Sequence, residues 1–203
     1  MSRGRPSTTA WAAVAAALLG LLGTAQLTET DLLRLGRAAL RAVLQDTSPD
    51  RAAPPGRDAL TGHPRIADGD TLTLNGTRIR MQGIDALEYD QNCTGPQGRF
   101  ACGAEGRAAL ERLIGGRPVT CTPDGSTSHD RIVATCTVRR EDGSVLDLNG
   151  AMVRSGYAFD CPKFSRGRYA PEERAARAAK DGAWAGRFDY PWSHRDRAGA
   201  CGR

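Results

Sequence analysis

Two carboxylate side chains, Asp85 and Glu88, lie three residues apart, and Arg80 precedes them by a few positions. Neighbouring carboxylates can take part in acid–base chemistry or bind a cation, but they can equally be the solvated acids of an ordinary loop. The stretch from residue 79 to residue 91, IRMQGIDALEYDQ, fits both interpretations. The elements around it decide whether further reactive side chains meet this pair.

A β-hairpin is predicted directly before the carboxylate pair. The dipeptide Asn-Gly at residues 75–76 is typical of a two-residue turn, and apolar and polar residues alternate around it. Such a turn places Thr71 opposite Arg80, with both side chains facing away from the core. Arg80 is then expected beside the corner at Asp70, and Asp85 and Glu88 follow directly after the strand that carries Arg80. Three acids, Asp70, Asp85 and Glu88, are therefore expected to converge with Arg80 at one end of the sheet. The core face of the hairpin is predicted to carry Leu72, Leu74, Ile79 and Met81.

The remaining elements predict an α+β domain. A helix is expected over residues 103–114, with Gly115 as its stop. Two strands and two helices follow: strands around Pro118–Thr122 and Arg131–Arg139, a helix from Asp147 to Gly156, and a helix with Pro171 in its first turn and Gly182 past its end. This order suits a five-stranded OB-type β-barrel with about three helices.

The composition sets wide limits on function. The chain has 203 residues, with 28 Lys and Arg against 23 Asp and Glu, which gives a net charge of +5. This excess permits a polyanionic partner without requiring one. Since no apolar run is long enough for a regular membrane span, a multi-pass membrane protein is excluded. We expect a monomer without an obligate protein partner.

Residues 1–25 predict export from the cytoplasm. Arg3 and Arg5 precede an uncharged stretch, AWAAVAAALLGLLGTA, which ends in small residues at Gly23 and Ala25. The segment is either a signal peptide cleaved after Ala25 or a retained membrane anchor. The protein is therefore expected to be periplasmic or secreted, or to be held at a membrane by its N-terminus.

Residues 26–64 are expected to form an appendage ahead of a folded domain at residues 65–203. Within residues 28–46, arginines recur at helical spacing on an otherwise apolar helix, which predicts a basic amphipathic helix. Such a helix could contact a membrane surface, or it could pack on another part of a protein. Residues 47–64 contain several prolines and are predicted to be a linker.

The six cysteines predict disulfide bonds. Their even number agrees with export, while the absence of a CxxC motif and the three scattered histidines argue against a zinc site. Six cysteines allow many pairings, and proximity in the sequence favours Cys93–Cys102, Cys121–Cys136 and Cys161–Cys201.

Several motifs in order resemble the thermonuclease family, also called staphylococcal nuclease-like. They are DGDTLTLNGTRIRMQGIDALE, the helix start at Cys102, RIVATC, DLNGAMVRSGYA and DGAWAGRFDYPW, which together span about two thirds of the chain. The resemblance implies an OB-fold barrel and the calcium-dependent hydrolysis of phosphodiester bonds in DNA and RNA.

The resemblance also implies a calcium site. Asp70 and Asp85 match the carboxylates that bind the ion, the backbone carbonyl of Ala86 matches a further ligand, and Asp68 lies nearby as a possible contributor. Carboxylates suit this role because calcium is a hard cation that takes oxygen ligands.

Three further residues match the family's catalytic positions. Glu88 corresponds to the glutamate usually assigned as general base, and Arg80 and Arg131 correspond to the two arginines that grip the scissile phosphate. A guanidinium group can bind phosphate oxygens in pairs and stays charged as negative charge builds up.

Two departures from the family pattern bear on activity. Leu87 stands where the family usually has proline, so the loop between the two carboxylates is expected to be freer. His129 and Asp130 replace a tyrosine and a glycine, and Asp130 could draw the guanidinium of Arg131 away from phosphate. Two hypotheses therefore remain, an exported calcium-dependent nuclease and a catalytically impaired module that binds nucleic acid or a protein.

Overall fold

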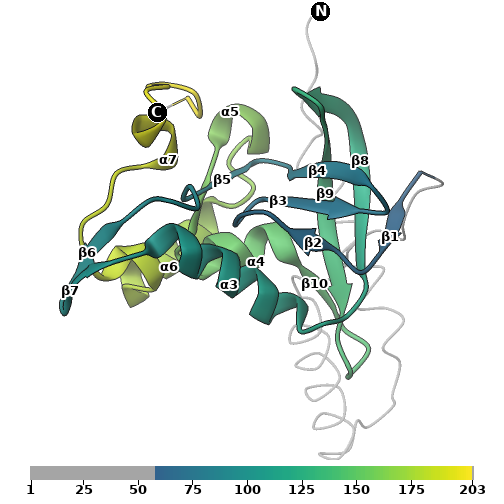
Figure 1. Cartoon of the computed structure of the whole chain (residues 1–203), viewed down its shortest axis with the longest axis horizontal. Coiled ribbons are helices and arrows are strands. Elements are labelled where there is room, and N and C mark those ends of the chain that lie inside the picture. The colour runs from purple at the N-terminus through teal and green to yellow at the C-terminus, as the bar shows by residue number, and fades with distance from the viewer. Residues whose placement is uncertain (1–57, 203) are drawn as a thin grey trace, which may run out of the picture. The chain divides into compact units, whose positions relative to one another are not determined.

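The computed structural model describes residues 58–202, which fold into a mixed α+β unit (Figure 1). The strands are β1 (Leu60–Gly62), β2 (Arg65–Ile66), β3 (Thr71–Leu74), β4 (Thr77–Met81), β5 (Ile84–Ala86), β6 (Cys93–Gly95), β7 (Gly98–Phe100), β8 (Val119–Ser128), β9 (Arg131–Arg139), β10 (Val145–Asp147) and β11 (Ala158–Asp160). The helices are α3 (Cys102–Ile114), α4 (Leu148–Arg154), α5 (Pro162–Ser165), α6 (Ala170–Ala179), the 3₁₀-helix η1 (Gly182–Ala185) and α7 (Pro191–His194). The predicted α+β class is confirmed.

The main sheet has seven strands in the order β1-β8-β9-β4-β3-β2, with β10 paired to β9. Its β3–β4 hairpin has the predicted register, with Thr71 opposite Arg80. Strand β4 runs parallel to β9, and all other pairs in this sheet are antiparallel. The main sheet thus has two strands more than the five expected, and three of its members, β1, β2 and β10, have only two or three residues each.

Two small two-stranded sheets lie outside the main one. Strand β11 pairs with β5 and places Phe159 opposite Asp85, while β6 pairs with β7. The β5–β11 pair matters for the site because its strand pairing holds the backbone of Asp85.

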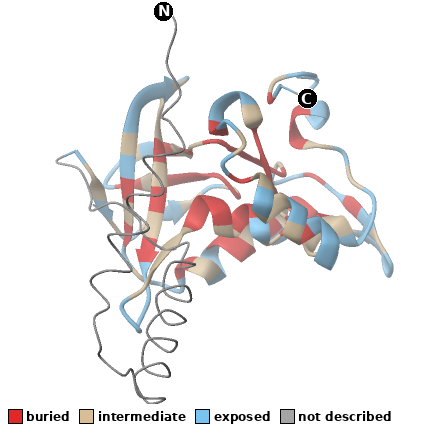
Figure 2. Ribbon diagram, turned by 180° about the vertical axis from the view of Figure 1, so that it is seen from behind, coloured by how far each residue is buried: buried red, intermediate tan, exposed pale blue. Residues whose placement is uncertain are grey.

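The core lies between the main sheet and helices α3 and α4, where Figure 2 shows a band of buried residues. The hairpin side chains predicted to face the core, Leu72, Leu74, Ile79 and Met81, are all fully buried. Helix α3 ends as predicted at Gly115, whose φ of 59° is left-handed and suits glycine. Helix α4 begins after Asp147, whose carboxylate accepts bonds from the backbone N–H groups of Asn149 and Gly150 at 3.0 and 3.3 Å. Helix α6 has Pro171 in its first turn and ends at Ala179, ahead of Gly182, as predicted, and Lys180 takes the left-handed conformation at its end.

The three disulfides are those predicted: Cys93–Cys102, Cys121–Cys136 and Cys161–Cys201. Proximity in sequence was a sound guide here, since Cys121 and Cys136 lie directly opposite each other on β8 and β9. Three disulfides indicate an oxidising, extracytoplasmic environment.

A second apolar cluster lies near the C-terminus, apart from the main core. It contains Leu87, Phe159, Trp192 and the Cys161–Cys201 bridge, with further aromatic side chains packed around them. Tyr190 stacks on Trp192 with ring centroids 4.5 Å apart, and Phe159 contacts both edge-on. This cluster fixes the last part of the chain, residues 187–202, against the rest of the unit.

The predicted signal or anchor at residues 1–25 and the predicted basic helix at residues 28–46 lie outside the described residues. The expected linker, residues 47–64, is described only from residue 58, and there strand β1 already pairs with β8. The folded part thus begins ahead of Arg65. Among residues 58–202, no helix combines the length and apolar character that a membrane crossing needs.

Candidate active site

The residues predicted to converge lie at one end of the sheet, where β3 begins and β5 follows β4. They are the acids Asp70, Asp85 and Glu88 and the arginine Arg80. Asp70 comes directly before β3, after a turn in which its backbone N–H donates to Asp68 Oδ1 at 3.0 Å. Asp85 is the central residue of β5. Both carboxylates are almost wholly buried, with 2% and 1% of Asp70 and Asp85 exposed. A buried pair of like charges needs positive partners close by.

Arg80 provides the first of these partners. Its Nη2 lies 3.1 Å from Asp70 Oδ2 and also forms an ion pair with Asp85 Oδ1. The same Asp70 oxygen accepts the backbone N–H of Ala86 at 2.8 Å. Arg80 thus bridges the two carboxylates, and the Ala86 N–H ties the corner before β3 to strand β5.

Arg131 joins the cluster through Thr71. Its Nη1 donates to Thr71 Oγ1 at 2.9 Å, and that hydroxyl donates to Asp70 Oδ1 at 3.0 Å. Thr71 was expected to face away from the core, yet only 2% of it is exposed, because its neighbours cover this end of the sheet. No carboxylate is bonded to the Arg131 guanidinium among the described residues, so it is the site arginine that remains available for an anionic ligand.

The expectation that Asp130 would capture the guanidinium of Arg131 is wrong. Asp130 instead pairs with Arg78 at 2.5 Å. Arg78 on β4 and Asp130 in the turn between β8 and β9 are both exposed, whereas the Arg131 guanidinium donates to Thr71. The hydrogen bond from Arg78 lowers the pKa of the Asp130 carboxyl, which stays ionised on the surface.

Glu88 lies in a loop that is held from several sides. Its backbone N–H donates to Gln91 Oε1 at 3.2 Å, and its carbonyl accepts the backbone N–H of Gln91 at 2.8 Å. The start of helix α3 lies so close that a Cβ on Gly103 would sit 1.6 Å from the Glu88 carbonyl oxygen. Leu87, expected to loosen this loop, is fully buried, and its N–H donates to the Tyr157 carbonyl at 3.1 Å. Burial and a backbone hydrogen bond at Leu87 thus hold this part of the loop.

One residue of the site was missed by the sequence analysis. Arg195, which directly follows α7, donates from Nη2 to Asp85 Oδ2 at 2.6 Å and forms an ion pair through Nη1 with Glu88 Oε1. Nothing in the local sequence marks it, since it is one of many arginines and lies 110 residues beyond Asp85. The one available signal was Cys201, whose predicted bridge to Cys161 brings this segment back toward strand β11.

Burial and mutual repulsion shape the charges of the acids. Burial raises the pKa of Asp85, and the nearby charge of Asp70 raises it further, while Arg80 and Arg195 oppose both effects. Burial and the charge of Asp70 likewise raise the pKa of Asp68 to about 6. Burial lowers the pKa of Arg131, as does the positive charge of Arg80. The site thus confines several like charges, and the arginines keep it close to neutral.

The donor set for a metal ion consists of two carboxylates at most. Within residues 58–202, no three His, Cys, Asp or Glu side chains lie close enough to hold a metal ion together. Asp70 and Asp85 are nevertheless bridged by one cationic group, the Arg80 guanidinium, which shows that the space between them suits positive charge. Asp68 lies at the edge of the cluster, where its carboxylate shapes the turn before Asp70.

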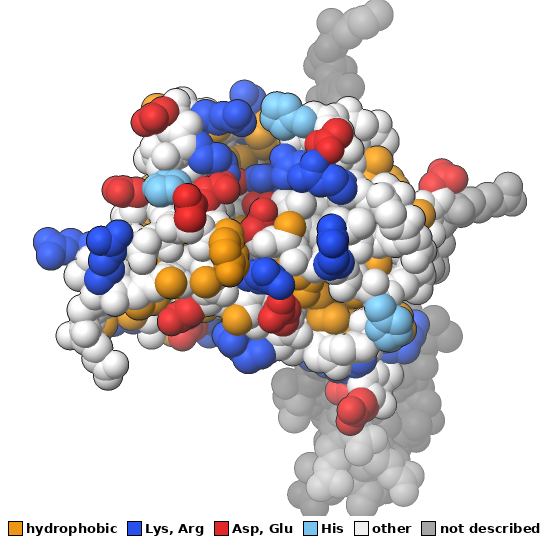
Figure 3. Space-filling model, in the orientation of Figure 1, with side chains coloured by type: hydrophobic (Ala, Val, Ile, Leu, Met, Phe, Trp, Pro, Cys, Tyr) orange, Lys and Arg blue, Asp and Glu red, His pale blue; other side chains and the backbone are white. Residues whose placement is uncertain are grey.

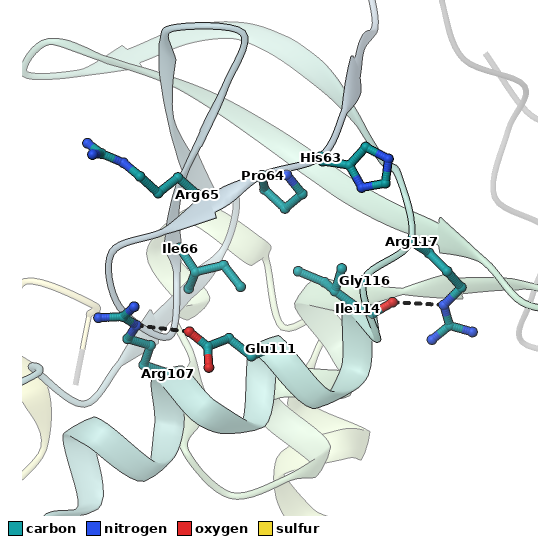
Figure 4. A pocket seen from close by; sticks show the side chains of 9 residues that line it. All are labelled: His63, Pro64, Arg65, Ile66, Arg107, Glu111, Ile114, Gly116 and Arg117. Carbon is teal, nitrogen blue, oxygen red and sulfur yellow. Dashed lines mark hydrogen bonds and ion pairs between the residues drawn. The ribbon is translucent and has the colours of Figure 1, made fainter.

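Figure 3 shows basic and acidic side chains next to one another over the part of this face where β4 and β5 run. A pocket of about 420 Å³ lies elsewhere, between β2 and the C-terminal half of α3 (Figure 4). Its basic side chains are partly engaged, since Arg107 pairs with Glu111 at 3.1 Å and Arg117 Nε donates to the Ile114 carbonyl at 2.7 Å. None of the predicted site residues lines this pocket.

Comparison with known proteins agrees with the sequence motifs. Residues 78–186 match the family model described as staphylococcal nuclease homologue. The succinoglycan biosynthesis protein ExoI of Rhizobium meliloti (strain 1021) is 33% identical over 159 residues, which cover 74% of this chain and 79% of that protein.

Two rice proteins (Oryza sativa subsp. japonica) described as probable staphylococcal-like nucleases, CAN2 and CAN3, are 33% and 32% identical over 128 residues. The aligned part covers 62% of this chain, but only 31% and 30% of the two rice proteins. Arg195 lies beyond the region that the family model matches.

Proposed function

Because the chain belongs to the staphylococcal nuclease homologue family, we propose that it is an exported, calcium-dependent nuclease that hydrolyses phosphodiester bonds in DNA and RNA. The observation that carries this proposal is the meeting of Asp70, Asp85 and Glu88 with Arg80 and Arg131 at one end of the sheet. We further propose that the seven-stranded sheet is this chain's form of the family's OB-type barrel, and that the nuclease domain spans residues 65–203 together with the preceding strand β1.

Glu88 is the proposed general base. Its side chain is 31% exposed, in contrast to the buried carboxylates beside it, so water can reach it. It would accept a proton from the attacking water, which raises the nucleophilicity of the oxygen at the moment of attack. Its backbone is fixed by Gln91 and by the start of α3, which supports a defined position for the carboxylate.

Arg131 is the proposed first contact of the scissile phosphate, because its guanidinium has no carboxylate partner among the described residues. Two of its nitrogens can bind two phosphate oxygens and can stabilise the charge that develops on them. Arg80 is the second proposed contact. It already bridges Asp70 and Asp85, so it would have to exchange one of these carboxylates for phosphate.

The residues present fit a calcium ion in chemical type. Asp70 and Asp85 offer buried carboxylate oxygens around a position that accepts a cation, and the Ala86 carbonyl is the third proposed ligand. When bound, such an ion would polarise a phosphoryl oxygen and lower the cost of its negative charge. Asp68 would add negative charge at the edge without being a required ligand.

The three disulfides support export, and the proposed location is periplasmic or extracellular, with the N-terminus either cleaved near Ala25 or retained as an anchor. Contact of residues 28–46 with a membrane surface and a monomeric state remain proposals of the same kind.

The test is cleavage of denatured DNA by the full chain, recovered from an oxidising compartment, with calcium or with a chelator. We expect cleavage only with calcium. Glu88→Gln should lower the rate by about 10²–10⁴-fold, since it keeps the shape but removes the base. Arg131→Lys should also lose much of the rate, because lysine lacks the paired N–H groups. The exposed residues Glu141 and Arg140 supply matched controls, Glu141→Gln and Arg140→Lys, which should change nothing.

Calcium binding gives a second measurement, by titration calorimetry. Asp85→Asn should weaken it, and added calcium should then restore part of the cleavage rate. Cleavage that ignores the chelator, or that survives both Asp85→Asn and Glu88→Gln, would refute the proposed site. A folded protein that binds single strands but never cuts them would favour the impaired binding module.

A further inference from the structure

Arg195 holds the two functional carboxylates of the β5 loop with a single guanidinium group. Its Nη2 bonds Asp85 Oδ2 at 2.6 Å, while its Nη1 forms an ion pair with Glu88 Oε1. A guanidinium is planar and rigid, so the two carboxylates that share it are held at a fixed separation. Only 24% of the Arg195 side chain is exposed, which strengthens both ion pairs relative to a surface contact.

The segment that carries Arg195 is itself firmly attached. The Cys161–Cys201 disulfide and a bond from the Lys163 N–H to the Cys201 carbonyl at 3.2 Å tie its end to the region after β11. Trp192, three residues before Arg195, is 3% exposed and stacks on Tyr190. These contacts fix the backbone of the segment, and the fixed backbone limits where the Arg195 guanidinium can lie.

The same segment holds the Glu88 loop by a second route. Gln91 Nε2 donates to the Asp189 carbonyl at 2.6 Å, and Gln91 Oε1 accepts the Glu88 N–H at 3.2 Å. Leu87 packs in the same apolar cluster as Trp192. The loop therefore contacts residues 187–202 through the Gln91 side chain, the apolar side chain of Leu87 and the carboxylate of Glu88.

We propose that Arg195 is a positioning residue of this site, which holds Glu88 and Asp85 in their working arrangement, and that residues 187–202 are the brace that delivers it. The proposal rests on the nuclease function proposed above. It assigns a role to a segment outside the family match, which ends at residue 186. It also explains how a loop with Leu87 in place of proline keeps Glu88 in a defined position.

The alternative role for the same contacts is obstruction, in which Arg195 blocks the two carboxylates and lowers activity. The two roles predict opposite effects of removing the guanidinium. The firm attachment of the segment favours positioning, because an obstructing arm has to leave for every turnover, whereas this one is bound by a disulfide and a buried tryptophan.

The test compares Arg195→Gln and Arg195→Lys with Arg197→Gln, an exposed arginine on the same segment, all in the full oxidised chain. The first measurement is amide hydrogen exchange without calcium or substrate. Arg195→Gln should raise the exchange rate of residues 87–91 by about tenfold or more and leave strands β8 and β9 unchanged. Arg195→Lys should fall between Arg195→Gln and wild type, and Arg197→Gln should match wild type.

The second measurement is the kinetics of DNA cleavage with calcium. Arg195→Gln should lower kcat by about 10²-fold with little change in KM, because Glu88 is then misplaced while phosphate binding at Arg131 is kept. In a Glu88→Gln background the same change should cost clearly less, because its effect through Glu88 is gone and only its contact with Asp85 remains.

Each result decides one claim. Unchanged exchange at residues 87–91 in Arg195→Gln would overturn the brace, and a higher kcat in that variant would replace positioning by obstruction. An undiminished loss in the Glu88→Gln background would overturn the claim that Arg195 acts through Glu88. If the wild type cuts no nucleic acid, the proposed nuclease function fails, and the exchange measurement alone decides whether Arg195 braces the loop.

Discussion

Alanine at position 103 should damage the site far more than it damages the fold. Gly103 is the second residue of helix α3, where alanine would normally stabilise a helix by about 1 kcal/mol relative to glycine. Here the new Cβ would meet the Glu88 carbonyl oxygen at 1.6 Å, whereas ordinary contact begins at 3.4 Å. The loop that carries Glu88 must therefore retreat by about 1.8 Å, the difference between these two distances.

The expected magnitudes follow from that displacement. Overpacking of a well-packed site costs about 1–3 kcal/mol, part of which the gain in helix propensity offsets, so the free energy of unfolding should fall by about 2 kcal/mol or less. A misplacement of about 1 Å can already cost about 10²-fold in rate, so kcat should fall by at least this factor. A large loss of activity with a small loss of stability is the signature of a displaced loop.

The assay pairs urea unfolding with the kinetics of denatured DNA cleavage in the presence of calcium. The matched control is Gly150→Ala in helix α4, where a new Cβ would have its nearest neighbour at an ordinary 3.5 Å. This control should leave kcat unchanged and should raise the free energy of unfolding by up to about 1 kcal/mol, through helix propensity alone. The reasoning is refuted if Gly103→Ala keeps kcat within about threefold of the wild type, because the loop would then have absorbed the clash without moving Glu88.

Three further outcomes are expected. Replacing Cys161 and Cys201 by alanine should lower the free energy of unfolding by about 4 kcal/mol in urea, from the chain entropy of a bridge with a sequence separation of 40, and an unchanged unfolding midpoint would contradict this. Leu87→Pro should lower the same quantity by about 2 kcal/mol or more, since it removes a buried side chain and the N–H that bonds the Tyr157 carbonyl; a stabilised variant would instead restore the idea of a loose loop. Asp68 has a pKa raised to about 6 in the folded state by burial and by a neighbouring acid, so its contribution to stability is present below about pH 4 and is lost as the pH rises through 6. Asp68→Asn should therefore remove this fall between pH 4 and pH 6, measured by unfolding without divalent cations, and an identical pH slope in both proteins would rule the effect out.

The part of the site formed by Asp70, Arg80 and Asp85 could be predicted from the sequence, because it depends on one hairpin and the few residues that follow it. The Asn-Gly turn sets the register of the β3–β4 hairpin, and that register alone places Arg80 beside Asp70. Asp85 follows Arg80 by 5 residues, so only a short loop has to be ordered to bring it to Arg80 and Asp70. The N-cap of α4 at Asp147 and the end of α3 at Gly115 could also be predicted, because each depends on a single residue at the end of a helix.

The contacts of Arg195, Asp130 and Leu87 could not be predicted, because they join segments that lie far apart in the sequence. Arg195 reaches Asp85 across 110 residues, and no periodicity or turn signal specifies such a contact. The partner of Asp130 was misjudged because neighbours in sequence need not be partners in space: Asp130, in the turn before β9, pairs with Arg78, while Arg131, the first residue of β9, bonds Thr71. The burial of Leu87 likewise depends on an aromatic cluster built from residues far away in the chain.

The Cys161–Cys201 bridge makes the assembly of the proposed active site depend on oxidation. The bridge ties the segment that carries Arg195 to the region after β11, so it can hold the guanidinium against Asp85 and Glu88 only once both thiols have been oxidised. Thiols stay reduced in the cytoplasm, so a chain that has not been exported would lack this bridge while it is still among the cell's own nucleic acids. Oxidation after export would complete the site only where cleavage does the producing cell no harm.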